Sequence, residues 1–507
     1  MTQKTYDSEF CGKVPIHLTN LIQPYGVLMV VETTGFQIIQ VSENATAIFE
    51  CPVESLIQKS LSEFIDGSAF KELQDKLKGE SSKIPGIWKL RGIQYLVLVH
   101  NKGTHLLIEI ELNSVSLSTR DTFIEVYQEL KYAMLAIEST QTISDACRIA
   151  AAELKRISGF DKVMIYRFDP EWNGTVMAED REPDMESYMG FTFPASDIPK
   201  QARDLYLKNA YRLIPDKDYV PVKLFPVVNP LSHSFLDLSD CNLRSVVAVH
   251  IEYLTNMGVT ASMSTRILHQ NKLWGLIACH HKSAKFLSYE MCSLFEMLST
   301  IISGKISSIE SAQALALDNL LGNSHSQLLE LVYKTKKLDE SLLGSKGVMA
   351  IFDASGAAIS RNGRLKTAGQ TPSPDQIEEL LLWLHTRQLR RVFYTDQLSS
   401  MHEYAKDYTA IGSGLLVIPL TNANDSYVLI FRPEKIRTIT WGGDPATRIT
   451  FDKDEKNYHP RSSFRQWQEM VTGISQAWRA AEISYAEELR SFIYEYETSD
   501  GDNDFNI

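Results

Sequence analysis

The residues of this chain that could do chemistry gather in the stretch 191–212. Its side chains include aromatic rings, the carboxylate of Asp197 and two guanidinium groups: Phe191, Phe193, Tyr206, Asp197, Arg203 and Arg212. Pro194 and Pro199 lie on either side of Asp197. Because proline fixes φ and lacks an amide hydrogen, residues 195–198 should form an irregular loop that can aim polar groups at a ligand. On local evidence alone, a surface turn before an amphipathic helix explains this stretch better.

Composition bounds the class of protein. With 507 residues, of which 44% are apolar, the chain should form roughly three globular domains. The net charge of −12 disfavours nucleic acid and an anionic membrane as partners. No apolar run approaches the roughly 18 residues of a membrane span, and residues 1–10 are too polar for a signal peptide, so we expect a cytoplasmic protein. The cysteines are scattered, as free thiols would be: Cys11, Cys51, Cys147, Cys241, Cys279 and Cys292.

Three segments share one pattern, an apolar strand that ends in an acidic turn: 26–35, 162–170 and 347–356. Helical stretches at 142–157 and 327–343 precede the second and third. Three related α+β modules in tandem would explain this repeat, which is only suggestive by itself. We expect the modules at 1–124, 125–310 and 311–490, and a helix end with an acidic tail at 491–507.

Two long helices are expected. Apolar residues from Leu294 to Ile309 recur on one helical face, and this helix should end near Gly322. A second series steps by three or four: Trp467, Val471, Ile474, Trp478, Ala481, Tyr485, Leu489, Phe492 and Tyr496. This near-heptad seam favours pairing with another helix, although a core-facing helix of one domain is the alternative.

The stretch 191–199 contains PASDIP, which resembles the motif in the chromophore-binding GAF domain of phytochromes. Further resemblances follow in the expected order, at 11–26, 166–172, 243–244, 250–258, 273–281, 441–443 and 460–464. The chain thus resembles a bacteriophytochrome photosensory core over nearly its whole length. The resemblance names the three modules PAS, GAF and PHY, and it implies that each is an antiparallel sheet flanked by helices, with long helices joining the modules. It also implies a PHY extension, the tongue, which we expect at about 427–467.

The resemblance implies a bound biliverdin, a linear tetrapyrrole, and assigns its pocket. Arg212 and Arg244 would pair with one propionate, and Ser262 and Ser264 would bond the other. The backbone carbonyl of Asp197 would accept the pyrrole hydrogens. The remaining pocket residues would wall the rotating ring, bond its carbonyl or sit beside the pyrroles: Tyr166, Phe193, Ile198, Tyr206, Tyr253, His280 and His250.

The resemblance also implies which cysteine is bonded to biliverdin. Plant-type relatives carry the thioether cysteine just before the histidine that matches His250, where this chain has Val249. The bacteriophytochrome arrangement uses the position of Cys11, with Cys241 as the nearest competitor. The N-terminal segment would then thread a GAF loop at about 221–242, with Ile22 inside. The chain departs from the family pattern at Tyr25, Asn20 and Val247-Ala248, which leaves the detailed hydrogen bonding and the absorption maxima open.

The function implied is red/far-red light reception: light isomerises the C15=C16 double bond, and the tongue responds. Asp197 would pair with Arg461 in the dark state and with Ser463 after photoconversion, while the tongue, which includes Trp441, changes from hairpin to helix. We expect a parallel homodimer joined by the C-terminal seam. A histidine kinase or diguanylate cyclase would follow in a longer protein.

Other classes of function fit the sequence less well. A GAF-type receptor for a cyclic nucleotide or another small metabolite is the main alternative. Cys279, His280 and His281 suggest zinc only weakly, because neighbours on a strand point to opposite faces. The sequence has no Gly-x-Ser-x-Gly elbow and no phosphate-binding Walker loop. We therefore expect no catalytic residues and no metal.

Overall fold

The computed structural model describes residues 15–79, 81–112, 120–420, 426–445, 449–451 and 458–503. They form two compact units. The first comprises residues 1–309 and 440–467, and the second comprises 310–439 and 468–507. In the described part of the chain, no helix is both long and apolar enough to cross a membrane.

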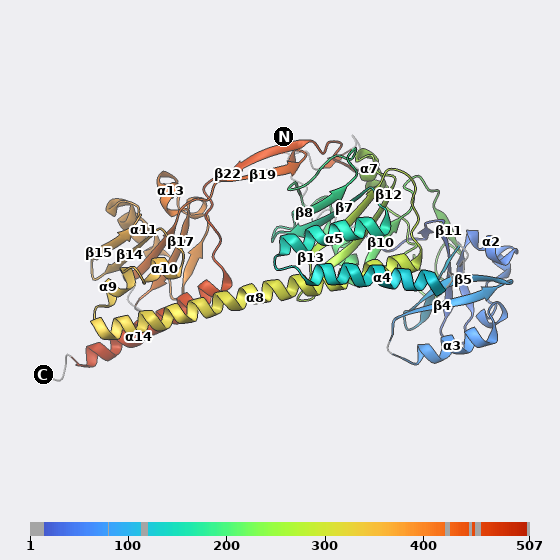
Figure 1. Cartoon of the computed structure of the whole chain (residues 1–507), viewed down its shortest axis with the longest axis horizontal. Coiled ribbons are helices and arrows are strands. Elements are labelled where there is room, and N and C mark those ends of the chain that lie inside the picture. Colours follow the sequence, from blue (N-terminus) through green and yellow to red (C-terminus); the bar gives the residue numbers. More distant parts are fainter. Residues whose placement is uncertain are drawn as a thin grey trace. The chain divides into compact units, whose positions relative to one another are not determined.

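The first unit begins with a seven-stranded sheet (Figure 1). Its order is β1 (Leu21–Ile22), β11 (Val222–Phe225), β3 (Ile38–Ser42), β2 (Gly26–Glu32), β6 (His105–Glu111), β5 (Ile93–Asn101) and β4 (Lys83–Leu90). Helices α2 (Thr46–Phe49) and α3 (Gly67–Leu77) accompany it. Ile108 and Ile110 of β6 face the core that includes α3, whereas Leu107 packs in a separate cluster. This alternation turns Glu109 away from the main core.

The N-terminal segment lies between the two arms of one loop. Leu21 and Ile22 pair with β11 on one side. On the other side Ile22 forms a bridge to Arg244, and Leu18 forms one to Asp237. Ile22 is fully buried. Both arms of the loop therefore enclose the segment that the resemblance places there.

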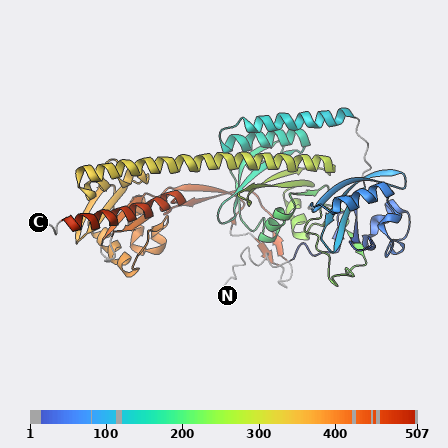
Figure 2. The same ribbon diagram turned by 90° about the horizontal axis from the view of Figure 1, so that it is seen from below.

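The central sheet of the first unit carries a helical layer. Six of its eight strands are, in order, β10 (Tyr211–Ile214), β12 (Ala261–His269), β13 (Lys272–His281), β7 (Lys162–Phe168), β8 (Gly174–Arg181) and β9 (Thr192–Phe193). A layer formed by α4 (Arg120–Glu138), α5 (Ile143–Ser158) and the first part of α8 (Tyr289–Thr335) packs on it (Figure 2). Thr142 caps α5 by accepting from the Asp145 amide at 3.1 Å. Helix 142–157 and the strands at 26–35 and 162–170 are confirmed.

Part of the tongue belongs to the first unit. Trp441 of β19 (Arg437–Gly442) pairs in parallel with Thr192 of β9. Strands β20 (Ile449–Phe451) and β21 (Tyr458–Pro460) form a separate antiparallel pair, and β22 (Gln466–Val471) follows.

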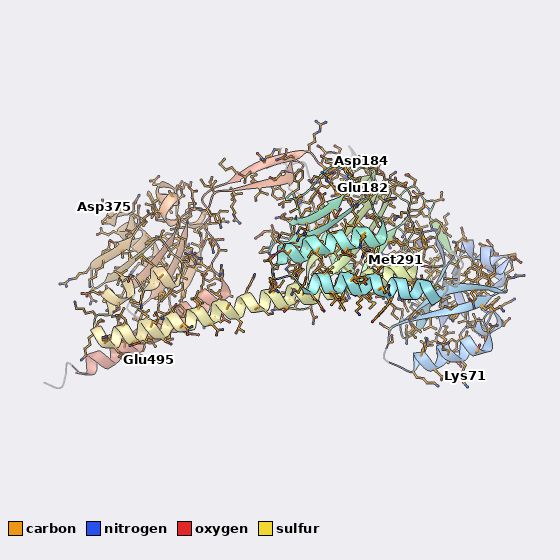
Figure 3. The ribbon with its side chains drawn as sticks, in the orientation of Figure 1. Lys71, Glu182, Asp184, Met291, Asp375 and Glu495 are labelled. Carbon is orange, nitrogen blue, oxygen red and sulfur yellow. The ribbon has the colours of Figure 1, made fainter. Side chains whose placement is uncertain are left out.

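The second unit is built on a five-stranded antiparallel sheet. Its order is β15 (Arg364–Gly369), β14 (Gly356–Arg361), β18 (Tyr427–Arg432), β17 (Gly414–Pro419) and β16 (Phe393–Thr395). The end of α8 and α14 (Ala480–Asn503) bury one core, and α11 (Pro374–Thr386) buries another. Shorter helices complete the unit: α9 (Leu338–Leu343), α10 (Val348–Ile351), α12 (Leu398–Met401) and α13 (Thr409–Gly412). Charged side chains such as Asp375 project from its surface (Figure 3).

Two expectations about the long helices are wrong. Helix α8 does not end near Gly322 but continues to Thr335, because Leu321 and Leu328 on either side of the glycine are buried in the second unit. The seam 467–496 is not one helix. Residues 466–471 form β22, and Gly473 has a φ of +72° that a helix does not allow.

The seam is also not free to pair with another chain. Trp478, Tyr485 and Leu489 are buried in the core of the second unit. The alternative, a core-facing helix, is therefore correct for α14. Periodicity showed an apolar face but could not show which surface covers it.

Two further boundaries differ from the expectation. Residues 348–351 form helix α10 instead of a strand, because Val348, Ile351 and Phe352 are buried at helical spacing. The tongue does not begin at 427, because Tyr427–Arg432 is the fully buried β18, paired with both β14 and β17. Within the described residues, the tongue can begin only after Arg432.

Candidate functional site

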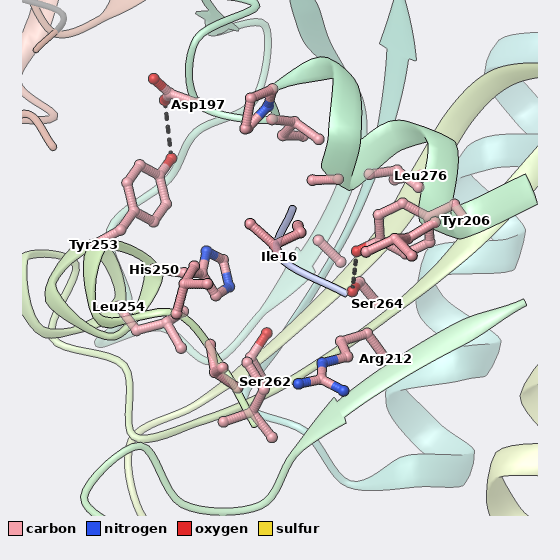
Figure 4. Close-up of a pocket in the computed structure, with 18 of the residues that line it drawn as sticks. Ile16, Asp197, Tyr206, Arg212, His250, Tyr253, Leu254, Ser262, Ser264 and Leu276 are labelled. Carbon is pink, nitrogen blue, oxygen red and sulfur yellow. Dashed lines mark hydrogen bonds between the residues drawn. The ribbon is translucent and has the colours of Figure 1, made fainter. Parts of the chain in front are cut away.

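A cavity of about 220 Å³ lies in the first unit, lined by α6 (Lys200–Lys208), α7 (Ala248–Asn256) and strands β10, β12 and β13. Its walls include every described residue that the resemblance assigned to the pocket. These are Tyr166, Phe193, Asp197, Ile198, Tyr206, Arg212, Arg244, His250, Tyr253, Ser262, Ser264 and His280. Figure 4 labels several of them, among them Arg212, His250 and Ser264. Cys11 lies outside the described residues.

The loop before α6 is held by a backbone hydrogen bond and by the side chain of Arg203. The Asp197 amide donates to the Pro194 carbonyl at 2.9 Å. The Arg203 Nη1 donates to the Ile198 carbonyl at 2.6 Å, and the guanidinium lies over the Trp172 ring at 4.5 Å. Pro199 then starts α6 in an extended conformation. These contacts fix the irregular loop that the prolines predict.

Aromatic rings form one wall of the cavity. Tyr166 and Phe193 meet edge to face at 5.7 Å between ring centroids. Tyr253 makes a similar contact with Phe464 of the tongue at 5.1 Å. Such a wall suits a flat conjugated ligand.

Two guanidinium groups lie in the cavity wall. Arg212 donates to the backbone carbonyls of Asn242, at 3.1 Å, and Arg244. Arg244 donates through Nη1 to the Ile16 carbonyl at 3.1 Å, and its buried Nε has no partner among the described residues. Burial, followed by the charge of Arg212, lowers the pKa of Arg244 to about 9. An anionic ligand would compensate this charge.

Hydroxyl groups come from β12, next to these cations. Ser264 pairs in register with Arg212, and Ser262 pairs with Ile214. The Ser264 Oγ and the Tyr206 hydroxyl are 2.5 Å apart. The sheet thus places hydroxyl and guanidinium groups side by side.

Both pocket histidines are neutral at pH 7. His250 on α7 stacks on Tyr253 with ring centroids 6.0 Å apart. Burial, followed by the charges of Arg212 and Arg244, lowers the pKa of His250 to about 4. Burial lowers the pKa of His280 to about 3, with a further contribution from Lys162. Each ring can therefore donate one hydrogen bond and accept another.

The tongue reaches this site through Arg461. Its guanidinium forms an ion pair with Asp197, and both side chains are about 95% buried, with exposed fractions of 3% and 5%. The Asp197 Oδ2 also accepts from the Tyr253 hydroxyl at 3.0 Å. Asn256 donates to the Arg461 carbonyl at 3.1 Å. Ser463 is exposed, and its hydroxyl accepts from the Arg465 amide at 3.4 Å.

Some site residues were missed from sequence. Ile16, Gln201, Met257 and Pro460 also line the cavity. Two of these residues could have been found from the sequence, because Ile16 lies close to Cys11 and Pro460 lies next to Arg461. His459 additionally contacts Glu252 of α7 at 2.9 Å, and no sequence pattern indicated this pair.

The donor set fits a linear tetrapyrrole. The aromatic walls match its apolar body. Its propionates are matched by the hydroxyls and by two cations that have no carboxylate partner among the described residues, and its polar ends are matched by the neutral imidazoles. The described residues contain no group of three potential His, Cys, Asp or Glu ligands. Cys279 faces the helical layer, whereas the neighbouring His280 faces the cavity.

Comparisons with known families agree with this geometry. The PAS fold model matches residues 11–113, the GAF domain model matches 142–306, and the phytochrome region model matches 322–500. A bacteriophytochrome from Xanthomonas campestris is 31% identical across 99% of this chain and 80% of its own length. Cyanobacterial phytochrome B from Nostoc is 38% identical across 96% of this chain and 66% of its own length.

Solved structures give the same result. The crystal structure of a bacteriophytochrome from R. palustris has a TM-score of 0.82 at 33% identity, covering 97% of this chain and 99% of that one. The photosensory core module of Stigmatella aurantiaca phytochrome also gives 0.82, covering 96% and 98%.

Fold and site together define a photosensory module that binds a bilin chromophore. The chain belongs to the phytochrome family, as a bacteriophytochrome photosensory core and red/far-red light receptor. It spans 64–66% of the length of the cyanobacterial relatives.

Proposed function

We propose that the cavity binds biliverdin and that Cys11 attaches it. The observation that carries this proposal is the pair Arg212 and Arg244, two cations in an aromatic cavity with no ion-pair partner among the described residues. When bound, biliverdin supplies a conjugated system that absorbs red light and a double bond that isomerises.

The position of Cys11 supports its role. Ile16 lines the cavity and lies five positions after Cys11. Five residues can span up to about 18 Å, so the thiol can reach the cavity. Cys241 is a weaker candidate, because its thiol is buried and donates to Glu109, and burial raises its pKa well above the usual value.

The residues that line the cavity would contact different parts of biliverdin. Arg212 and Arg244 would hold one propionate, and Ser262 and Ser264 would hold the other. The Asp197 carbonyl and His250 would serve the central pyrroles. His280 would bond the carbonyl of the terminal ring, and the aromatic residues would surround that ring: Tyr166, Phe193, Tyr206 and Tyr253.

The tongue relays the change. We assign the pair of Asp197 and Arg461 to the dark state, with Asp197 exchanging to Ser463 after light. Trp441 on β19 would move with it. A tongue with two hydrogen-bonded arrangements is the bistable element that a switch requires.

The wider assembly is part of the proposal. PAS, GAF and PHY domains would occupy 1–124, 125–310 and 311–490 of a cytoplasmic, parallel homodimer. An output enzyme would follow in the full protein.

Because the α14 seam is buried, the dimer contact should involve exposed apolar residues of α8 such as Leu315 and Leu320, which are 61% and 62% exposed.

Absorption spectroscopy tests the binding proposal. Protein co-expressed with a heme oxygenase should be blue-green and should change its spectrum reversibly under red and far-red light. A colourless protein that binds a cyclic nucleotide in calorimetry would overturn the proposal.

Attachment is tested separately with Cys11→Ser. This variant should remain coloured, because the non-covalent contacts persist, but should lose the zinc-induced fluorescence of its band on a denaturing gel. Cys241→Ser is the matched control and should keep that fluorescence. If the band of Cys11→Ser still fluoresces, another residue carries the bond.

A further inference from the structure

A buried carboxylate of the N-terminal sheet holds the backbone next to Arg244. The Glu109 Oε2 accepts from the Leu243 amide at 2.7 Å and from the Cys241 thiol at 3.2 Å. Glu109 lies on β6, and the alternation of the strand turns it away from the core that contains Ile108. A carboxylate of the first sheet thus contacts the loop that carries a pocket residue.

His100 on the neighbouring strand β5 orients this carboxylate. The His100 Nε2 lies 2.6 Å from the Glu109 Oε1, and the side chains are only 4% and 7% exposed. Although burial opposes ionisation, hydrogen bonds from His100 and from the amides of Asn242 and Leu243 lower the pKa of Glu109. The carboxylate is therefore ionised and has a fixed direction.

The segment 241–244 is shared between Glu109 and the pocket. Arg212 donates to the carbonyls of both Asn242 and Arg244, and Arg244 itself lines the cavity. Leu243 is tightly packed, since a Cβ on Gly26 would lie 2.7 Å from its side chain. A shift of the Leu243 backbone would therefore be passed directly to both guanidinium groups.

We propose that Glu109, oriented by His100, is a positioning residue for the arginine pair. It fixes the Leu243 amide and so sets where Arg244 and Arg212 present their charge to an anionic group. This inference rests on the proposed binding of biliverdin, and it extends the determinants of the pocket to the N-terminal sheet.

Three variants separate positioning from general stability. Glu109→Leu removes both acceptor oxygens. Glu109→Gln keeps one oxygen for the Leu243 amide, and its NH₂ donates to the His100 Nε2 in the tautomer in which that nitrogen carries no hydrogen. Ile108→Ala is the matched control, because it deletes core packing from the adjacent residue on the opposite face of β6.

Two readouts are taken on the full chain. In the protein without bilin, hydrogen–deuterium exchange of peptides covering 241–245 should accelerate about tenfold in Glu109→Leu, as expected for the loss of one charge-assisted hydrogen bond of about 1.4 kcal/mol. After biliverdin is added, covalent attachment should slow about tenfold and the red absorption band should shift. Glu109→Gln should restore both properties to within about threefold of the unaltered protein.

The control decides between the two explanations. Ile108→Ala should lower the unfolding temperature while leaving exchange at 241–245 and the red band unchanged. The positioning role would be overturned if residues 241–245 exchanged equally fast in Glu109→Leu and in the unaltered chain. It would also be overturned if Ile108→Ala changed the exchange and the red band as much as Glu109→Leu does. An unaltered chain that takes up no biliverdin would instead refute the proposed function, while the exchange result would still test the role of Glu109 in the loop.

Discussion

Arg212 and Arg244 place two positive charges in one cavity wall, where burial already lowers the pKa of Arg244 to about 9. Their hydrogen bonds go to backbone carbonyls, which orient the guanidinium groups without neutralising them. Such a site favours an anion over a neutral ligand, because the anion supplies the missing charge. At the residue scale, this pair distinguishes the pocket from an ordinary apolar cavity.

The neutral histidines give the fold a pH dependence. The pKa values of His250 and His280 are about 4 and about 3, below the value of about 6.5 in an unfolded chain. Between these values the unfolded state binds more protons, so the free energy of unfolding should fall as the pH drops from about 6.5 toward 3. It should level off below that range.

Chemical denaturation of the bilin-free protein at several pH values measures this slope. His280→Gln should flatten it, whereas His233→Gln, a change in an exposed loop histidine, should not. An unchanged slope in His280→Gln would show that other groups dominate.

Asp197 is predicted to couple the pocket to the tongue. Asp197→Ala leaves the guanidinium of Arg461 buried without its carboxylate and should weaken the tongue contact by about 3 kcal/mol. The variant should still bind bilin but form little of the far-red-absorbing state, measured by difference spectroscopy. Asp204→Ala, on the exposed face of α6, is the control. A wild-type yield in Asp197→Ala would contradict the coupling.

Helix α8 carries glycine at a position where no structural need for it is seen. A Cβ on Gly322 would meet no atom within 4 Å, and the residue is exposed and helical. Gly322→Ala should therefore raise the free energy of unfolding of the second unit by about 0.5–1 kcal/mol. Denaturant titration followed by circular dichroism measures this change.

Gly275→Ala provides the contrast at the element scale. Its Cβ would collide with the backbone of Tyr166 on the paired strand β7, so this variant should be destabilised. If Gly322→Ala were also destabilised, the glycine would be needed for a bend or a contact with another chain.

The proposed dimer sets the prediction at the scale of the whole molecule. Leu315→Glu combined with Leu320→Glu should weaken dimerisation at least about tenfold, because charges would replace apolar surface at an interface. Bilin binding should be unaffected, since neither residue lines the cavity.

Light scattering over a range of concentrations measures the dimerisation, and Leu382→Glu, on the exposed surface of α11, is the control. A dimer of unchanged affinity would exclude this part of α8 from the interface. A monomeric unaltered chain would refute the dimer altogether.

Much of the site could be predicted from the sequence because short motifs carry it. The two prolines around Asp197 dictate an irregular loop, and the arginines, histidines and serines stand in motifs whose order identifies the family. Local chemistry of this kind does not depend on distant contacts. The strands at 26–35 and 162–170 and the helix at 142–157 were predictable for the same reason.

The tertiary structure decided which surface covers each apolar face and where the elements end, which the periodicity of the sequence leaves open. The α14 seam has the spacing of a coiled coil, yet Tyr485 and Leu489 pack in their own unit, because an apolar face is stabilised by whichever surface reaches it. Gly322 remains helical because its buried neighbours hold α8 together, and residues 427–432 join the five-stranded sheet of the second unit because strands β14 and β17 both pair with them. Glu109 and Leu243 are 134 positions apart and meet only when the loop folds onto the first sheet. Sequence thus determined the chemistry of the pocket, whereas long-range packing determined which segments hold it.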